Sequence, residues 1–530
     1  MYRLYNKIIL LAGLVFILAS CTKDLNTVPL DPKSITSATV FDNPAAYKEA
    51  LAKIYAGLAL SGQQGPAGAA DISGIDEGFG EYLRGLWYLE ELPTDEAVIS
   101  WNDQTIKDFH NQSWGSSDVF ISAFYYRVFY QIGLCNEFLR QTTDAKLNER
   151  GVDADLKAKI KHYRAEARFL RALSYYHALD EFGNVPFVTE KDPVGAFFPK
   201  QISRADLFNY IESELKAIEP DLIDARQNEY GRADKAADWT LLAKLYLNAK
   251  VFTGQERNTD CITYCKKVID AGYSLKPEYK DLFLADNNVN NNEVIFSVNF
   301  DGIHTQTWGG TTFIIHAAVG GSMTPADYGI DGGWAGTRTT SAFVNKFPDV
   351  TGTTDKRAMF YTDGQKLEIN DVGKFTDGYA ITKFKNITST GTPGSDLTFP
   401  DTDFPMFRLA DVYLMYAEAV VRGGAGGDMA TAVNLVNKLR ERAYGNNSGD
   451  ITANDLTLDF ILDERARELY WEAQRRTDLI RFGKFTGGDY LWPWKGGVKE
   501  GTATDSHYDL YPIPASDITS NPNLVQNPGY

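Results

Sequence analysis

Apolar residues at helical spacing dominate this chain and limit the folds that it can adopt. In three segments, residues 169–179, 239–249 and 410–420, apolar side chains recur at positions i, i+3, i+4, i+7 and i+10. This spacing places them on one face of an α-helix. Residues 462–473 keep a related stripe. The sequence therefore predicts a mainly α-helical fold.

The stripes combine large side chains with alanines, as in Trp239, Ala243, Tyr246 and Ala249. A bulky residue on one helix can fill the gap above an alanine on its neighbour, as in helix pairs of the tetratricopeptide type. The four stripes have no fixed period, and a plain helical bundle would give a similar pattern. Both alternatives stay open on the stripes alone.

Two regions have a different texture. Residues 280–405 are rich in Gly, Thr, Asn and Asp, with short apolar runs at 294–296 and 312–315. These are signals of loops and short strands, and a long irregular insertion in a helical protein often carries function. Four prolines between residues 509 and 530 predict an extended strap on the surface.

The charge of the chain is acidic and well mixed. The 530 residues carry a formal net charge of −17, and basic residues are interspersed with acidic ones without any run of five. This pattern argues against nucleic acid or anionic lipid as a partner and indicates a well-solvated surface.

The N-terminus predicts a lipoprotein. Two basic residues precede the apolar run 8–19, which is too short to span a bilayer comfortably and ends in Leu18-Ala19-Ser20-Cys21. This resembles a bacterial lipobox, in which residues 1–20 are removed and Cys21 becomes the lipidated first residue. The alternative is an ordinary secretory signal with an incidental cysteine. No second apolar stretch approaches the length of a membrane helix, so the lipid would be the only anchor.

The expected domain organisation follows from these features. Residues 1–20 form a lipoprotein signal peptide, residues 21–40 a lipidated tether and residues 41–530 a single domain with the loop-rich insertion at about 280–405.

Three further cysteines remain, Cys135, Cys261 and Cys265. Cys261 and Cys265 lie four residues apart on one face of an expected helix, and no nearby histidine completes a metal site. We interpret them as buried thiols.

A glycoside hydrolase would need two carboxylates that flank the scissile bond. The pairs Asp76/Glu77 and Asp95/Glu96 are available, but 70 acidic residues make such pairs inevitable. No G-x-S-x-G, H-E-x-x-H or phosphate-loop motif occurs. The sequence therefore predicts a protein without catalytic activity, and hydrolysis is kept as an alternative.

Four long segments, residues 168–187, 408–419, 461–484 and 511–530, resemble the SusD/RagB family of outer-membrane nutrient-binding lipoproteins and follow its order. The resemblance implies a SusD-like α-helical fold with four tetratricopeptide-like helix pairs. It also implies a lipid-anchored, cell-surface position on the outer membrane. The implied partner is a SusC-like TonB-dependent transporter, which the lipoprotein covers as a lid.

Shorter segments are similar to the starch-binding founder of that family. They are residues 91–96, 231–237, 375–378 and 491–497. This closer resemblance implies the binding of starch or malto-oligosaccharides, which are α-1,4-glucans. A binder of a different glycan or of peptides remains the alternative within the family.

The resemblance also implies the binding residues. Trp101, Trp308 and Trp334 match positions that stack on the sugar, and Arg84 and Gln104 match positions that bind its hydroxyl groups. Trp308 replaces a tyrosine of the founder and Gln104 an asparagine, which preserves stacking and amide chemistry but leaves chain length and linkage open. Trp87, Trp239 and Trp471 are assigned to packing instead.

No cofactor is predicted, although calcium remains possible because the starch-binding relative can hold it near the insertion. The matching residues 286–292 have amides where acids would suit calcium better, and Pro493 replaces a possible acidic ligand.

Overall fold

The computed structural model describes residues 40, 41 and 43–530. The signal peptide, the lipidation site Cys21 and almost all of the expected tether lie outside the described residues. None of the helices in the described part combines the length and the apolar character needed to cross a bilayer.

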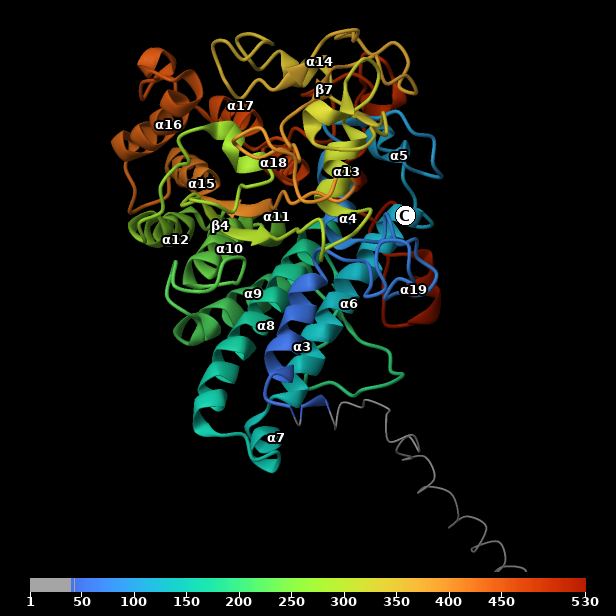
Figure 1. The fold of residues 1–530 in the computed structure, drawn as a ribbon, viewed down its shortest axis with the longest axis vertical. Helices are drawn as coiled ribbons and strands as arrows, with labels where there is room; N and C mark the ends of the chain where they lie inside the picture. Colours follow the sequence, from blue (N-terminus) through green and yellow to red (C-terminus); the bar gives the residue numbers. More distant parts are fainter. Residues whose placement is uncertain (1–39, 42) are drawn as a thin grey trace, which may run out of the picture.

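One end of the molecule is a layer of long helices (Figure 1). Helices α3, α6 and α8 pack on one another, and α9 packs on α8. The helices of this layer are α3 (Ala46–Ala56), α6 (Val119–Gln141), α7 (Asp144–Glu149), α8 (Ala154–Glu181) and α9 (Arg204–Ile218). The predicted stripe 169–179 lies inside α8, where its residues are buried.

A second group of helices continues from this layer. They are α10 (Lys235–Leu247), α11 (Ala249–Thr253), α12 (Asn258–Asp270), α15 (Leu409–Val421), α16 (Met429–Tyr444), α17 (Leu458–Leu469) and α18 (Arg475–Arg481). Helix α12 packs between α10 and α15, and α15 packs on α16. Such successive neighbours are compatible with the predicted helix pairs.

Two predicted stripes run past the ends of their helices. Helix α10 ends at Leu247, so Ala249 belongs to the next helix. Helix α17 ends at Leu469, and Ala473 lies in the following turn with a left-handed φ of 55°. Hydrophobic spacing identified the buried residues there but not the breaks between helices.

The predicted insertion carries most of the irregular structure and its short strands. The four strand pairs of the described residues are all antiparallel. They are β1 (Val98–Ile99) with β5 (Thr337–Arg338), β2 (Val185–Pro186) with β3 (Gln201–Ile202), β4 (Val294–Val298) with β8 (Phe404–Arg408), and β6 (Phe360–Tyr361) with β7 (Ala380–Ile381).

The short helical elements lie mainly around the strands and at the turns. The α-helices are α4 (Tyr82–Glu91), α5 (Asp108–Asn111), α13 (Gly310–Ala317), α14 (Ser341–Val344) and α19 (Ala515–Ser520). The 3₁₀ turns are η1 (Glu219–Asp221), η2 (Tyr279–Phe283), η3 (Pro325–Tyr328), η4 (Asn447–Gly449), η5 (Lys495–Gly497) and η6 (Ser506–Asp509).

The run 294–296 is a strand as predicted, but the strand signal at 312–315 was wrong. Those residues lie in α13, whose side chains are all buried and which packs on α4. The β-branched residues there favour a strand only as a weak preference, which tertiary packing overrides.

The C-terminal strap is extended apart from α19 and is fastened to the helical layer. The Tyr511 hydroxyl donates to the Leu89 carbonyl, and the Asn527 amide donates to the carbonyls of Phe182 and Tyr511. Trp114 donates its indole N–H to the Tyr530 hydroxyl at 2.7 Å. The last residue of the chain is therefore part of the packed structure.

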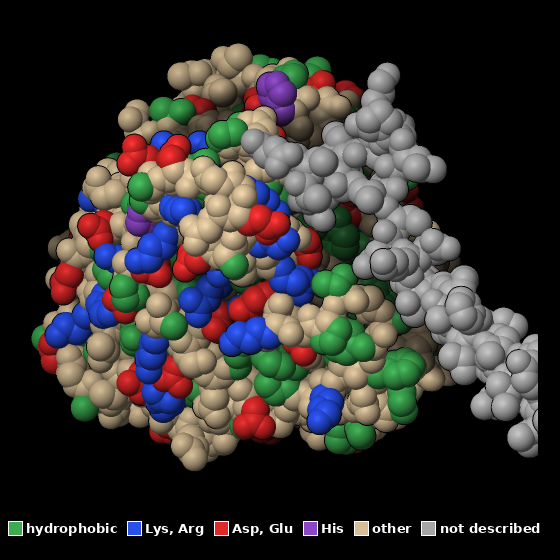
Figure 2. All heavy atoms as spheres, turned by 90° about the horizontal axis from the view of Figure 1, so that it is seen from below, with side chains coloured by type: hydrophobic (Ala, Val, Ile, Leu, Met, Phe, Trp, Pro, Cys, Tyr) green, Lys and Arg blue, Asp and Glu red, His purple; other side chains and the backbone are tan. Residues whose placement is uncertain are grey.

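The remaining predictions for packing residues are confirmed in the described residues. Cys135, Cys261 and Cys265 are buried free thiols. Trp87 and Trp471 are buried, and Trp239 is half-buried against the core. Basic and acidic side chains alternate over the face in Figure 2, as the mixed charge of the sequence indicates.

Buried ion pairs join α17 to the strands of the core. The Arg408 guanidinium lies 3.0 Å from a Glu293 oxygen and 2.6 Å from oxygens of both Glu468 and Glu472. All four side chains are buried. Because each charge has lost its water, the cluster is stable only with every partner in place.

We expect Arg408→Leu to lower the free energy of unfolding by about 3–5 kcal/mol, since it removes a cation that three buried carboxylates share. Urea unfolding followed by circular dichroism measures this. As a control, Lys161→Ala breaks a largely exposed pair with Asp221 and should cost less than about 1 kcal/mol. Equal effects of the two variants would contradict this role of Arg408.

Candidate functional site

The structure brings the three predicted stacking residues together. The ring centroids of Trp101 and Trp334 are 6.3 Å apart with planes at 44°, and those of Trp334 and Trp308 are 6.2 Å apart at 54°. All three indoles are half-buried. Trp334 is thus the middle one of three indole rings in a row. We call this row the tryptophan arc (Trp101, Trp334 and Trp308) and each of its rings a plate.

The first plate is positioned by the pairing of β1 with β5. Ser100, next to the end of β1, donates its N–H to the Gly336 carbonyl, and the Trp101 indole N–H donates to the Trp334 carbonyl at 3.0 Å. A Cβ atom on Gly336 would come within 2.7 Å of the Trp101 ring. Only glycine lets the two segments approach this closely.

The middle plate is supported from behind by His316 of α13, a residue that the sequence analysis did not select. Its ring stacks on Trp334 with centroids 4.8 Å apart and planes at 26°. His316 Nδ1 lies 2.6 Å from the Gly332 carbonyl oxygen, and burial lowers its pKa below the ordinary value. The mistaken strand signal over 312–315 hid which residues of this segment share a face.

Arg84 lies against the tryptophan arc. Its guanidinium donates to the Trp308 carbonyl at 2.8 Å and to the Tyr88 hydroxyl at 2.9 Å. The same group lies 4.6 Å from the ring centroid of Phe313 and 5.9 Å from that of Trp101. Arg84 therefore fixes the backbone that carries Trp308 as well as lying close to Trp101.

Gln104 lies in the turn that follows Trp101. It is exposed, has a left-handed φ of 42° and lines a hollow of about 380 Å³ with Asp76 and Tyr126. A Cβ on Gly78 would lie 3.0 Å from an Asp76 carboxylate oxygen and 3.5 Å from the Trp308 Cβ. The loop at Gly78 therefore lies close both to the hollow and to the Trp308 end of the arc.

Glu81 is a second residue that no sequence pattern pointed out. One carboxylate oxygen accepts from the Leu83 N–H, and the other accepts from the N–H groups of Arg84 and Gly310, all at 2.7 Å. Glu81 therefore caps α4 and also fixes the start of α13, two residues after Trp308. Burial raises its pKa to about 7.

The pair Asp95/Glu96, considered above as possible catalytic acids, is buried against Arg475. Burial raises the pKa of Asp95, but the Arg475 guanidinium, 2.8 Å away, outweighs it and holds the pKa at about 2. Burial raises the pKa of Glu96 to about 8. Glu96 accepts from the N–H of Trp471, whose φ is 64°. These two carboxyls therefore stabilise the turn between α17 and α18.

The residues proposed for calcium show other contacts. The Asp286 carboxylate accepts from both the N–H and the hydroxyl of Ser389, and Asn287 bonds to the backbone of Asp403. Among residues 40, 41 and 43–530, no cluster of three or more His, Cys, Asp or Glu could hold a metal ion.

Comparison with known proteins identifies relatives over the whole chain. The family model described as the SusD family matches residues 361–530. The chain is 37% identical to the starch-binding protein SusD of Bacteroides thetaiotaomicron, over 99% of each sequence. It is also 27% identical to the SusD-like protein P25 of Formosa agariphila, over 97% of each.

A solved structure shows the same fold. The surface glycan-binding protein A from Bacteroides fluxus superposes with a TM-score of 0.71 at 21% identity, covering 92% of this chain and 100% of that one. The predicted SusD-like, mainly helical architecture is confirmed by this similarity.

Glu81→Asp tests whether the carboxylate positions the arc. Asp also caps helices well, but its shorter side chain cannot hold both α4 and Gly310. We expect the free energy of unfolding to fall by about 1–3 kcal/mol, since the buried Gly310 N–H loses its acceptor, and the Gly310 amide to lose most of its protection from hydrogen exchange. Urea unfolding and hydrogen–deuterium exchange measure the two effects. Unchanged protection of the Gly310 amide in the folded variant would contradict the role.

The raised pKa of Glu96 gives a prediction for stability against pH. A group whose pKa is higher in the folded state than in the unfolded state stabilises the fold at a pH below its unfolded pKa. It loses this contribution as the pH rises through its folded pKa. For Glu96 this window lies between about pH 4.5 and about pH 8. Glu96→Gln, which cannot ionise, should make urea-unfolding stability fall less across this window. An identical pH dependence in both proteins would refute the assignment.

Proposed function

Because the chain belongs to the SusD family, we propose that it binds starch and malto-oligosaccharides without hydrolysing them and that the tryptophan arc is the binding surface. The observation that carries the proposal is the geometry of the arc. Neighbouring indole planes lie at 44° and 54° to one another, and neighbouring centroids are about equally far apart, at 6.3 and 6.2 Å. Plates that are inclined to one another suit a curved ligand better than a flat one.

The chemistry of α-1,4-glucans fits such a row. Each sugar ring has an apolar C–H face and a polar edge, and the chain coils. A flat aromatic ring covers the apolar face and contributes about 0.5–1.5 kcal/mol per pairing if it behaves like other aromatic contacts. The half-buried state of the indoles supports this role, since one part of each ring is fixed by packing while another part stays accessible.

The polar residues beside the arc can orient a bound sugar through hydrogen bonds to its hydroxyl groups. Arg84 has two of its five N–H groups engaged with protein acceptors in the described residues, and the others can donate to sugar hydroxyls. Gln104 can donate and accept, and Asp76 at the edge of the hollow can accept. A few such groups around an apolar surface are typical of ligand sites.

We further propose that the protein is a lipid-anchored component of the outer-membrane surface and delivers glucan to a SusC-like TonB-dependent transporter. Family membership and the lipobox-like sequence ending in Cys21 support this. An open arc is compatible with delivery, because single oligosaccharides should bind with only about −4 to −8 kcal/mol, which is millimolar to micromolar affinity. Long polymers can still be retained through several simultaneous contacts.

A solved structure supports a second candidate function, the binding of a glycan with a different linkage. The surface glycan-binding protein A from Bacteroides thetaiotaomicron, in complex with laminarihexaose, superposes with a TM-score of 0.67 at 20% identity, covering 91% of this chain and 98% of that one. Trp308 also departs from the founder's tyrosine, which leaves linkage preference to be measured.

We expect isothermal titration to detect maltoheptaose but neither cellohexaose nor laminarihexaose. The triple variant Trp101→Ala, Trp308→Ala, Trp334→Ala should lose this binding and its retardation in starch-containing native gels, because the apolar sugar faces lose their three plates. Circular dichroism checks folding.

Trp239→Ala is the control, since it removes an indole of α10 that donates to Glu219 and is not part of the arc. Full binding by the folded triple variant would refute the site. Binding of laminarihexaose alone would favour the other linkage. Steady release of reducing ends from amylose, lost on mutation of one carboxylate, would favour the hydrolase.

A further inference from the structure

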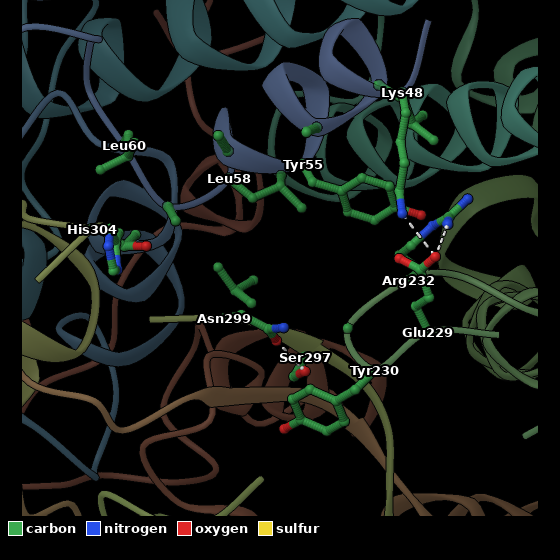
Figure 3. Close-up of a pocket in the computed structure, with 17 residues that line it drawn as sticks. Lys48, Tyr55, Leu58, Leu60, Glu229, Tyr230, Arg232, Ser297, Asn299 and His304 are labelled. Carbon is green, nitrogen blue, oxygen red and sulfur yellow. Dashed lines mark hydrogen bonds and ion pairs between the residues drawn. The ribbon is translucent and has the colours of Figure 1, made fainter. Parts of the chain in front are cut away.

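A separate cavity of about 410 Å³ lies between the helical layer and the start of the loop-rich region. Its walls come from α3 and the turn after it, the turn at residues 229–232, the end of β4, and residues 304–305. Figure 3 shows Tyr55, Asn299 and Tyr230 around this cavity from three different elements. Its volume falls in the range of about 300–1,000 Å³ that is usual for small-molecule sites.

The wall of the cavity is held in place by buried hydrogen bonds. The Tyr55 hydroxyl donates to the Glu166 carboxylate at 2.7 Å and accepts from the Ala233 N–H at 2.9 Å. Arg232 binds the same carboxylate through two nitrogens, at 3.0 and 2.5 Å. Helix α3 and the turn at residues 229–232 are therefore held against one another, and the cavity is formed before any ligand enters.

The charges that line the cavity neutralise one another. Lys48 lies 2.8 Å from a Glu229 oxygen, and Arg232 lies between Glu166 and Glu229. No lining cation is left without an acidic partner in the described residues, so the cavity does not select an anion. Its chemistry fits a neutral ligand.

The rest of the lining combines apolar and polar surface. Leu51, Leu58 and Val298 supply an aliphatic floor, and the Tyr230 ring, 45% exposed, forms one side. The Asn299 amide and the Thr305 hydroxyl lie at the rim. Apolar surface with a few hydroxyl and amide groups is suited to a sugar ring, which has a C–H face and a polar edge.

The position of the cavity connects it to the tryptophan arc. Thr305 at the rim precedes Trp308 by three residues, so their Cα atoms are at most about 11 Å apart even if the chain between them is fully extended. A glucan that stacks on Trp308 needs only a few more sugar units to arrive at the rim. The two surfaces can then bind one chain.

We propose that this cavity is a second subsite that receives a neutral glucosyl unit of a chain bound on the tryptophan arc. The inference rests on the proposed function and adds the place where a longer chain gains affinity. Short oligosaccharides occupy the arc alone. Longer ones fill both places.

The test compares chain lengths in a variant with a filled cavity. Ala52, an exposed lining residue of α3, is replaced by tryptophan. Ala430→Trp, at an exposed position of α16, is the matched control. Thr305→Val removes a rim hydroxyl while keeping the shape, and thermal unfolding checks all three proteins.

Isothermal titration with maltotriose and maltoheptaose gives the result. In the unmodified protein and in Ala430→Trp, we expect maltoheptaose to bind about 10-fold more tightly, or about 1.4 kcal/mol. In Ala52→Trp, this advantage should fall below about 3-fold while maltotriose binds as before. Thr305→Val should give an intermediate loss.

A full maltoheptaose advantage in both folded cavity variants would overturn the subsite and leave the arc intact. Failure of the unmodified protein to bind either oligosaccharide would overturn the proposed function, and the subsite with it. The two failures are therefore distinguishable in one set of titrations.

Discussion

Buried ion pairs between the loop-rich region and α17 are the constraint on which the rest of the structure depends. Arg357 and Lys383 come from the insertion. The Arg357 guanidinium contacts Glu464 and Glu468. The Lys383 ammonium group contacts Glu472, three residues after the end of α17. A region with so few strand hydrogen bonds cannot fix its own shape. Because these charges are desolvated, only one arrangement satisfies them all, and the insertion keeps a defined position on the helices.

The same principle extends from the scaffold to the candidate site. Arg475 of α18 holds Asp95, which precedes β1, and β1 leads to Trp101. Glu81 binds both α4 and the first residue of α13. Trp334 donates its backbone N–H to the carbonyl of His316 on α13. Each plate of the arc is thus connected to a helix by a polar contact. Such preorganisation would limit the entropy lost on binding of the flexible polymer proposed above.

Much of the fold could be predicted from the sequence, because the hydrophobic spacing of a helix can be recognised within a short segment of the chain. The stripes at 169–179 and 410–420 lie inside α8 and α15 as predicted, since hydrophobic spacing reports which face is buried. Prediction from the sequence failed at residues 312–315, where the packing of α13 against α4 overrides the local preference for a strand. It also failed at Ala473, which lies in a turn with positive φ that the distant Glu91 carboxylate holds.

What the sequence determined by itself was the helical scaffold, the family resemblance and the identity of three candidate stacking residues. Only the tertiary structure decided that Trp101, Trp308 and Trp334 form one row, that His316 and Glu81 support it, and that a neutral cavity lies nearby. The physical reason is distance along the chain. These contacts join residues up to 233 positions apart, and local patterns carry no information about which distant side chains meet.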